Sequence, residues 1–189
     1  SLLTEPTYQG CRGSVVRVPF DADDSSDEFF CCGLSTSKPV FGAQVVGESN
    51  QDGGGELLMQ VPADAPFGSY AVSLTCATQG DYSFGLEVND VAAPIVTSAP
   101  AFTAVGETFT VTGENLADII SIRAFRPRDA TIAFCNIDQA TQTATSVSCS
   151  FNAIPQSADN DDYYLLDVAS NDCGSAANRP KFIVNLNTR

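Results

Sequence analysis

Along much of the chain, apolar residues alternate with small or polar ones in short stretches that end at Gly or Pro. Leu57–Val61 is a short apolar stretch that ends at Pro62, and a Pro-Phe-Gly turn follows at residues 66–68. In Tyr70–Thr75, Tyr, Val and Leu alternate with Ala, Ser and Thr. A period of two places one face in the core and the other in water, so this region predicts two β-strands joined by a turn.

The second half of the chain shows the same organisation. Phe109–Leu116 predicts a strand that runs into a Gly/Asn turn, and Ile119–Ala124 predicts the next one. Thr131–Asn136 and Ser146–Phe151 predict two further strands on either side of the polar segment 137–145. No segment has a sustained period of 3.6 residues with helix caps, so the pattern favours an all-β chain.

The two halves can be aligned with each other, which indicates an internal duplication. Six landmarks correspond in order, among them Gly13–Val18 with Gly106–Val111, Ser69–Val72 with Asp162–Leu165, and Phe84–Val88 with Lys181–Asn185. The repeat of about 95 residues has the size of one seven-stranded sandwich. We therefore expect two tandem immunoglobulin-like β-sandwiches, residues 1–92 and residues 93–189, joined by a short and semi-rigid connection.

The charge of the chain excludes some partners. The 189 residues carry a net charge of -14, of which residues 1–92 contribute -10 and residues 93–189 contribute -4. Such a chain repels nucleic acid and anionic membrane surfaces. No apolar run approaches the roughly 18 residues that span a bilayer, so we expect no membrane insertion by this chain. Ser1 begins no signal peptide, and an exported protein would already have lost its leader.

Candidate chemistry is sparse. The chain has no His, which excludes Ser-His-Asp and Cys-His catalysis and argues against a zinc site. We therefore expect a protein that is not an enzyme and has no cofactor. One acidic loop is a weak candidate for Ca²⁺, although it lacks the Gly and the distal Glu of an EF-hand. Its acidic residues are Asp21, Asp23, Asp24, Asp27 and Glu28. This loop and the acidic run at residues 159–162 are expected to be solvated.

Pro100–Leu116 reads P-x-F-x-x-x-G-E-T-F-T-V-T-G-E-N-L. This stretch resembles the opening of the plexin and transcription-factor immunoglobulin-like family, called IPT or TIG, and Val61–Leu74 resembles the close of such a domain. The resemblance implies a fold found in receptor ectodomains, surface proteins and enzyme-attached modules, without implying an activity. Cys135 and Cys149 resemble the family's hairpin cysteine pair. A bridge between them would contribute about 3 kcal/mol in the chain-entropy model.

The seven cysteines favour an extracellular, secreted or cell-surface protein with disulfides. Cys31 and Cys32 are adjacent on a predicted strand and face opposite sides, with Cys11 and Cys76 as available partners and three possible connectivities. Cys173 is the odd residue. It is expected to be either a buried thiol or a partner in a bond to the first half or to a neighbouring subunit.

Arg123, Arg126 and Arg128 form the only basic cluster in the sequence. Pro127 interrupts the predicted strand there, so we expect the arginines on an edge or loop. They are either a solvated patch or a docking site for the acidic first half of another copy. Head-to-tail contacts of that kind produce rings or open filaments.

These features predict a non-enzymatic structural subunit that associates end to end into a surface fibre or appendage. The terminal segments Leu2–Thr4 and Phe182–Leu186 are candidates for strand exchange between chains. The partners expected are therefore further copies of the chain, with glycan decoration possible on Ser and Thr. The alternative is a ligand-binding ectodomain fragment of a receptor or adhesin that recognises protein or glycan. An exposed aromatic patch would favour this alternative.

Overall fold

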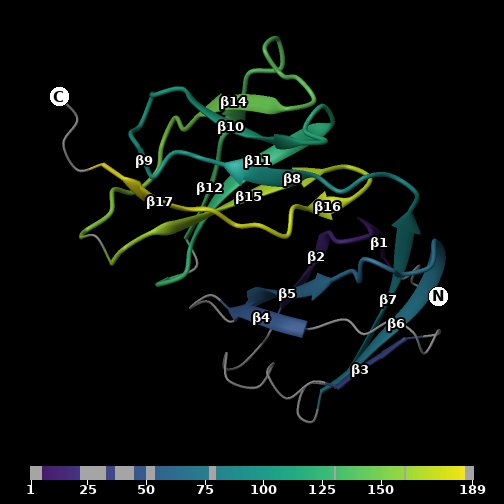
Figure 1. The fold of residues 1–189 in the computed structure, drawn as a ribbon. Coiled ribbons are helices and arrows are strands. Elements are labelled where there is room, and N and C mark those ends of the chain that lie inside the picture. Colours follow the sequence, from purple (N-terminus) through teal and green to yellow (C-terminus); the bar gives the residue numbers. More distant parts are fainter. Residues whose placement is uncertain are drawn as a thin grey trace. The chain divides into compact units, whose positions relative to one another are not determined.

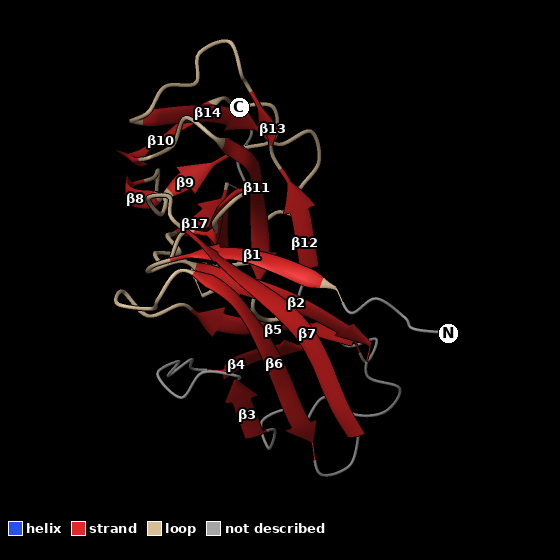
Figure 2. Ribbon diagram, turned by 90° about the vertical axis from the view of Figure 1, so that its right-hand side faces the viewer, coloured by secondary structure: helices blue, strands red, loops and turns tan. Residues whose placement is uncertain are grey.

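The computed structural model describes residues 6–21, 33–36, 45–49, 54–76, 80–129, 131–159 and 161–185. All regular secondary structure in these residues is β-strand, as Figures 1 and 2 show. The described part of the chain accordingly holds no helix that could cross a membrane.

The chain divides into two compact units. The first comprises Ser1–Ala93 together with Asp172–Gly174, and the second comprises Pro94–Asn171 and Ser175–Arg189. The sequence-based division between residues 92 and 93 did not include the short segment Asp172–Gly174 in the first unit. Cys173 is joined to Cys11 of that unit by a disulfide, which accounts for the assignment.

The first unit contains two sheets. One has the strand order β1-β7-β6-β3, and the other pairs β2 with β5 and β5 with β4. The strands are β1 (Thr7–Cys11), β2 (Val15–Asp21), β3 (Gly33–Thr36), β4 (Val45–Ser49), β5 (Gly54–Gln60), β6 (Gly68–Cys76) and β7 (Gly80–Asn89). β1 runs parallel to β7, whereas the other pairs are antiparallel.

The second unit has the same plan. One sheet has the order β13-β14-β10-β8, and in the other β12, β11, β15, β17 and β9 follow one another. Its strands are β8 (Ile95–Ser98), β9 (Phe102–Thr103), β10 (Phe109–Glu114), β11 (Ile119–Arg126), β12 (Thr131–Phe134), β13 (Asn136–Ile137), β14 (Ser146–Ser150), β15 (Tyr164–Ser170) and β17 (Lys181–Val184). The two-residue strand β16 (Gly174–Ser175) follows β15.

This strand order is that of an immunoglobulin-like sandwich. In the second unit, β8, β10, β14 and β13 correspond to the A, B, E and D strands of one sheet, and β11, β15 and β17 correspond to C, F and G of the other. The first unit repeats the arrangement with β2, β5 and β4 as B, E and D. The chain is therefore all-β and consists of two tandem immunoglobulin-like sandwiches.

Each unit has its own hydrophobic core, formed by the inward-facing residues of its two sheets. In the first unit the core includes Val16, Met59, Val61, Tyr70, Val72, Phe84 and Leu86. In the second it includes Val111, Leu116, Ile122, Phe151, Tyr164, Leu166, Phe182 and Val184. The rings of Phe109, Phe151, Phe182 and Tyr164 follow one another in stacked contacts, with centroids 5.6 to 6.0 Å apart.

Two local features confirm that the units are built alike. Gly13 and Gly106 have φ angles of 81° and 82° in the same turn before the B strand, a conformation that favours glycine. Tyr70 and Tyr164, near the starts of β6 and β15, are buried and donate their hydroxyls to the carbonyl oxygens of Pro66 and Pro155. This is the tyrosine corner of immunoglobulin-like domains.

The tyrosine corner also corrects the alignment of the repeat. The sequence alignment placed Tyr70 opposite Tyr163, but Tyr164 is the buried residue with the corner hydrogen bond. A shift of one residue exchanges the inner and outer faces of a strand. Tyr163 is therefore directed to the outer face of the sheet.

The Gly-Glu-Asn segment that carried the family resemblance has a clear backbone role. A Cβ atom on Gly113 would lie 1.8 Å from the carbonyl oxygen of Ile95, so only glycine fits beside β8. Asn115 has a φ of 59°, as expected for the turn after β10. The turn predicted at this point is therefore present.

The described residues contain two disulfides. Cys135 is bonded to Cys149, and Cys11 is bonded to Cys173. Cys173 is thus neither a free thiol nor bonded to another subunit, and Cys11 is not a partner for Cys31 or Cys32. Those two cysteines, and the side chain of Cys76, lie outside the described residues.

We predict that Tyr164→Phe lowers the free energy of unfolding of the second unit by about 1 kcal/mol, because the hydrogen bond from the hydroxyl of the buried Tyr164 to the carbonyl of Pro155 is lost. Tyr163→Phe is the matched control and should change it by less than about 0.5 kcal/mol. Urea titrations of both variants measure the difference. Equal stability of the Tyr164→Phe variant and the wild type would contradict the role of the corner.

Candidate functional site

The second unit carries a groove of about 530 Å³ on its outer surface. Seven residues line it, and they come from β9 and the residue before it, from β17, and from the segment before β15. They are Ala101, Phe102, Asp161, Tyr163, Lys181, Phe182 and Ile183. The volume falls within the range of small-molecule sites in proteins, which is roughly 300–1,000 Å³.

The apolar lining of the groove follows from the register of the strands. Ile183 of β17 lies opposite Phe102 of β9, and Phe182 lies opposite Tyr164 of β15. Because side chains alternate along a strand, Phe102, Ile183 and Tyr163 share the face directed away from the core. The side chain of Phe102 is 61% exposed, so this face presents a largely uncovered aromatic ring.

Charged groups flank the apolar row. The ammonium group of Lys181 lies 4.4 Å from the centroid of the Tyr163 ring, a cation–π contact that orients both side chains. Asp161 is exposed, and its N–H donates to the carboxylate of Asp159. The groove therefore combines an aromatic surface with one hydrogen-bond donor group and one acceptor group.

The first unit provides an internal comparison. Ser69, Glu87 and Gln9 lie opposite one another on β6, β7 and β1. Counted from the tyrosine corner and the Gly13 turn, they are the equivalents of Tyr163, Ile183 and Phe102. They are polar and bonded to other side chains: Ser69 donates to Glu87, and Gln9 accepts from Asn89. The fold therefore does not require apolar residues at these positions, and their presence in the second unit is specific to it.

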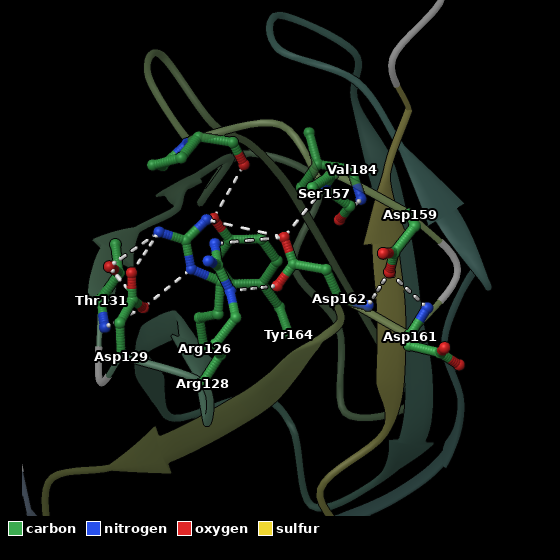
Figure 3. A network of polar contacts seen from close by, with 12 residues as sticks. Arg126, Arg128, Asp129, Thr131, Ser157, Asp159, Asp161, Asp162, Tyr164 and Val184 are labelled. Atoms are coloured by element: carbon green, nitrogen blue, oxygen red, sulfur yellow. Dashed lines mark hydrogen bonds and ion pairs between the residues drawn. The ribbon is translucent and has the colours of Figure 1, made fainter.

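A polar network beside the groove fixes the segment between residues 155 and 162 (Figure 3). The carboxylate of Asp162 accepts hydrogen bonds from the guanidinium of Arg128 at 3.1 and 3.4 Å and from the N–H of Ala158 at 3.0 Å. Asp159 accepts from the N–H groups of Asp161 and Asp162.

The same segment is tied to β17 and to the core. Ser157 and Val184 exchange two hydrogen bonds, at 3.1 and 3.2 Å. The hydroxyl of Tyr164 donates to Pro155 at 2.7 Å. Together these bonds fix the positions of Asp161 and Tyr163 at the groove.

Arg126 connects the network to β11. It donates to both carboxylate oxygens of Asp129, at 2.8 and 2.6 Å, and lies 3.9 Å from Asp162. The hydrogen bonds from Arg126 hold the pKa of Asp129 well below its usual range. The N–H of Ala158, helped by the arginines, lowers the pKa of Asp162 although burial opposes the shift. Burial raises the pKa of Tyr164.

The arginine cluster does not form the exposed patch that the sequence suggested. The expectation of an edge or loop is wrong for Arg123 and Arg126, which lie on β11 between β12 and β15 with residue exposures of 8% and 7%. Arg123 donates to the buried Asp167 at 3.0 Å, and Arg179 donates to the same carboxylate at 2.6 Å. Only Arg128 has a largely exposed side chain, at 60%.

Other predicted residues have different outcomes. The candidate Ca²⁺ loop lies outside the described residues, apart from the backbone of Asp21 at the end of β2. Among the described residues, no three His, Cys, Asp or Glu side chains form a cluster suited to a metal ion. The acidic run at 159–162 was expected to be solvated, but Asp162 is only 5% exposed.

Of the two terminal segments expected to exchange strands between chains, the structure describes part of one. Leu2–Thr4 lies outside the described residues. Phe182 and Val184 are buried in the core, and β17 already pairs with β15 and β9. The C-terminal candidate segment is therefore not available for exchange over residues 182–184.

Sequence reasoning missed Phe102, Tyr163 and Ile183. The signal was available in the internal repeat, because these positions are apolar in one half and polar in the other. To detect this difference, the two halves of the chain must be aligned without an error of even one residue. The sequence alignment placed Tyr70 opposite Tyr163, one residue before its true equivalent Tyr164.

No family model and no curated protein matches the sequence. The chain is similar to the N-terminal Ig1-2 module of the Drosophila receptor protein tyrosine phosphatase DLAR, with 15% identity, a TM-score of 0.40 and coverage of 97% of both chains. It is similar to the titin Ig tandem domains A164-A165, with 12% identity, a TM-score of 0.28 and coverage of 98% of this chain and 95% of that one.

A third similar structure is the Bacteroides ovatus mixed-linkage glucan utilization locus protein SGBP-B in complex with a mixed-linkage heptasaccharide. Identity is 14% and the TM-score is 0.38, with coverage of 93% of this chain. The match spans only 43% of that longer protein. All three likenesses concern the fold alone.

We predict that the second unit loses stability as the pH falls below about 4. Asp129 and Asp162 have lowered pKa values in the folded state, so their contribution is complete above the unfolded pKa and is lost as pH falls through the folded one. Asp162→Asn should cost about 2 kcal/mol at pH 6 and make the acid limb shallower. The matched control Asp161→Asn should cost less than about 0.5 kcal/mol at pH 6.

Urea denaturation between pH 2 and pH 7 measures these effects. An acid limb with the same slope in the wild type and the Asp162→Asn variant would contradict the assignment.

Proposed function

We propose that this chain is a non-enzymatic extracellular binding module, and that the groove of the second unit holds the sugar units of a glycan. The observation that carries the proposal is the row of Phe102, Tyr163 and Ile183, which is apolar where the equivalent row of the first unit is polar. Exposed apolar side chains that the fold does not require are typical of a binding surface.

The chemistry of the groove suits a carbohydrate. A sugar ring has an apolar C–H face, which packs against an aromatic ring, and an edge of hydroxyl groups that both donate and accept hydrogen bonds. Phe102 offers such a ring, while Asp161 and Lys181 offer an acceptor and a donor at its side. A neutral glycan is also not repelled by a chain with a net charge of -14.

The size of the groove favours a glycan over a protein ligand. A stable protein–protein interface buries about 800 Å² on each partner. A groove of about 530 Å³ has room for one or two sugar units but not for an interface of that extent. A long polysaccharide can continue beyond an open groove on both sides.

Two further properties support an extracellular location and a binding role. The two disulfides in the described residues are typical of oxidising compartments. The absence of His from the sequence leaves no Ser-His-Asp or Cys-His arrangement for catalysis. We also propose membership of the IPT/TIG class, on the basis of the Pro100–Leu116 resemblance and the glycine that β8 requires at position 113.

The structural-subunit hypothesis has less support than the binding hypothesis. Head-to-tail docking through the arginines would need Arg123 and Arg126 at the surface, and both are buried in ion pairs with aspartates of their own unit. A polymer would therefore have to use other contacts.

The binding proposal is tested by giving the groove the residues of the first unit. The triple variant Phe102→Gln, Tyr163→Ser and Ile183→Glu copies the equivalents Gln9, Ser69 and Glu87. Isothermal titration of the wild type with neutral hexasaccharides from β-glucan, xylan and mannan should identify a binding sugar. The variant should bind that sugar at least about tenfold more weakly, with unchanged circular dichroism.

Phe134→Gln is the matched control, because Phe134 is also largely exposed, at 66%, but lies outside the groove. It should bind the hexasaccharide as the wild type does. A wild type that binds none of the three sugar families, or a triple variant with undiminished affinity, would overturn the proposed function.

A further inference from the structure

The free edge of β12 is a second surface that has no role in the proposed function. β12 pairs with β11, and no other strand of the described residues pairs with it. Figure 2 shows it at the margin of the second unit. Ile132 and Phe134 are 43% and 66% exposed, so two large apolar side chains stand on this edge.

The hydrogen-bond pattern shows which main-chain groups face outward. The N–H of Cys135 donates to the carbonyl of Ile122 at 2.8 Å, next to the register pair of Phe134 with Arg123. In an antiparallel ladder, bonded and non-bonded pairs alternate. Ala133 therefore bonds to β11, whereas the N–H and C=O groups of Ile132 and Phe134 point away from the sheet.

This edge lacks three of the devices that protect edge strands, although at four residues β12 is short, which is a further such device. Lys, Pro and bulges serve that purpose in natural sheets. β12 reads Thr-Ile-Ala-Phe, and its register with β11 is continuous. The edge strand β8 differs, because its pairing with β10 is interrupted between Thr112 and Gly113.

The lack of charge on β12 permits a second copy as the partner of this edge. Two copies with a net charge of -14 repel each other, so a contact between them must run through uncharged residues. β12 has no charged residue, and the neighbouring Arg126 is already neutralised by Asp129. No like charges would therefore oppose each other if two β12 strands met.

We propose that β12 pairs antiparallel with β12 of a second copy, with Ala133 on the two-fold axis. In this register Ile132 of each chain lies opposite Phe134 of the other, and their outward N–H and C=O groups form four main-chain hydrogen bonds. The non-bonded pair, where the chains approach most closely, is formed by two small alanines. The inference goes beyond the proposed function and does not depend on it.

The contact is isologous, so it closes a dimer rather than extending a filament. Its small area predicts a weak dimer, with a dissociation constant on the order of 0.1 mM. Such a dimer presents two grooves and would gain avidity toward a ligand with repeated units.

Sedimentation equilibrium from about 1 µM to about 1 mM brackets this dissociation constant and should show a reversible monomer–dimer transition. Ile132→Pro removes one outward N–H while leaving the bonds to β11 intact, and Phe134→Lys adds the charge that edge strands commonly carry. Each should weaken dimerisation about tenfold or more. Phe102→Lys, which changes a similarly exposed Phe in the groove, should dimerise like the wild type.

The register is tested by the double variant Ile132→Glu, Phe134→Lys. In the proposed register each Glu lies opposite a Lys of the other chain, so the double variant should dimerise more tightly than either single variant. Raising the salt concentration should strengthen the wild-type dimer, because it screens the repulsion between acidic chains.

Three results would overturn the inference: a wild type that remains monomeric throughout the range, a dimer that survives both Ile132→Pro and Phe134→Lys, or a double variant no better than the singles. These results are separable from those for the groove. The Phe134→Lys variant tests dimerisation with hexasaccharide binding as a control, and the triple groove variant tests sugar binding with dimerisation as a control.

Discussion

The segment between β14 and β15 has to satisfy its buried polar groups, and this constraint organises the second unit. Tyr164 bonds to the carbonyl of Pro155 at one end, and Asp162 takes up the N–H of Ala158 and the guanidinium of Arg128 at the other. An unpaired buried carboxylate at Asp162 would cost more than these bonds contribute when they are made. The segment is thereby held in one conformation, and the groove lies beside it because Tyr163 immediately precedes the anchored tyrosine.

The two units show which positions the fold constrains and which it leaves free. Inward residues such as Val72 and Leu166 are apolar in both, because each sandwich must fill its core. The outer row carries Gln9 and Glu87 in one unit and Phe102 and Ile183 in the other, on strands with the same pairing. When equivalent strand positions are polar in one unit and apolar in the other, the fold cannot be the reason for the apolar residues. Such a difference indicates a functional role more directly than any motif in the chain.

The sequence was sufficient for the strands and the tandem organisation, because both depend on local patterns. Alternation in Tyr70–Thr75 and the glycine before each B strand are visible without knowledge of long-range contacts. The bond between Cys11 and Cys173 spans 162 residues and leaves no local trace. The burial of Arg123 was equally hidden, because it requires Asp167 on the neighbouring strand. The groove was not predicted from the sequence, because the alignment of the two halves was wrong by one residue and an offset of one residue exchanges the two faces of a strand.

The acidic character of the chain has the same consequence for the groove and for the edge of β12: it favours contacts through uncharged groups. A net charge of -14 keeps copies apart and disfavours anionic ligands, so lasting contacts must be made by uncharged groups. Among the described residues of the second unit, the exposed apolar side chains include Phe102 in the groove and Ile132 and Phe134 on the edge of β12. In the proposed arrangement a single small groove would bind weakly and a four-residue edge would associate weakly, but a repeated ligand that engaged two paired copies would make the second binding event intramolecular. Low affinity at each groove and at the β12 edge is therefore compatible with firm attachment to a polymer, provided that sugar binding and β12 pairing occur together.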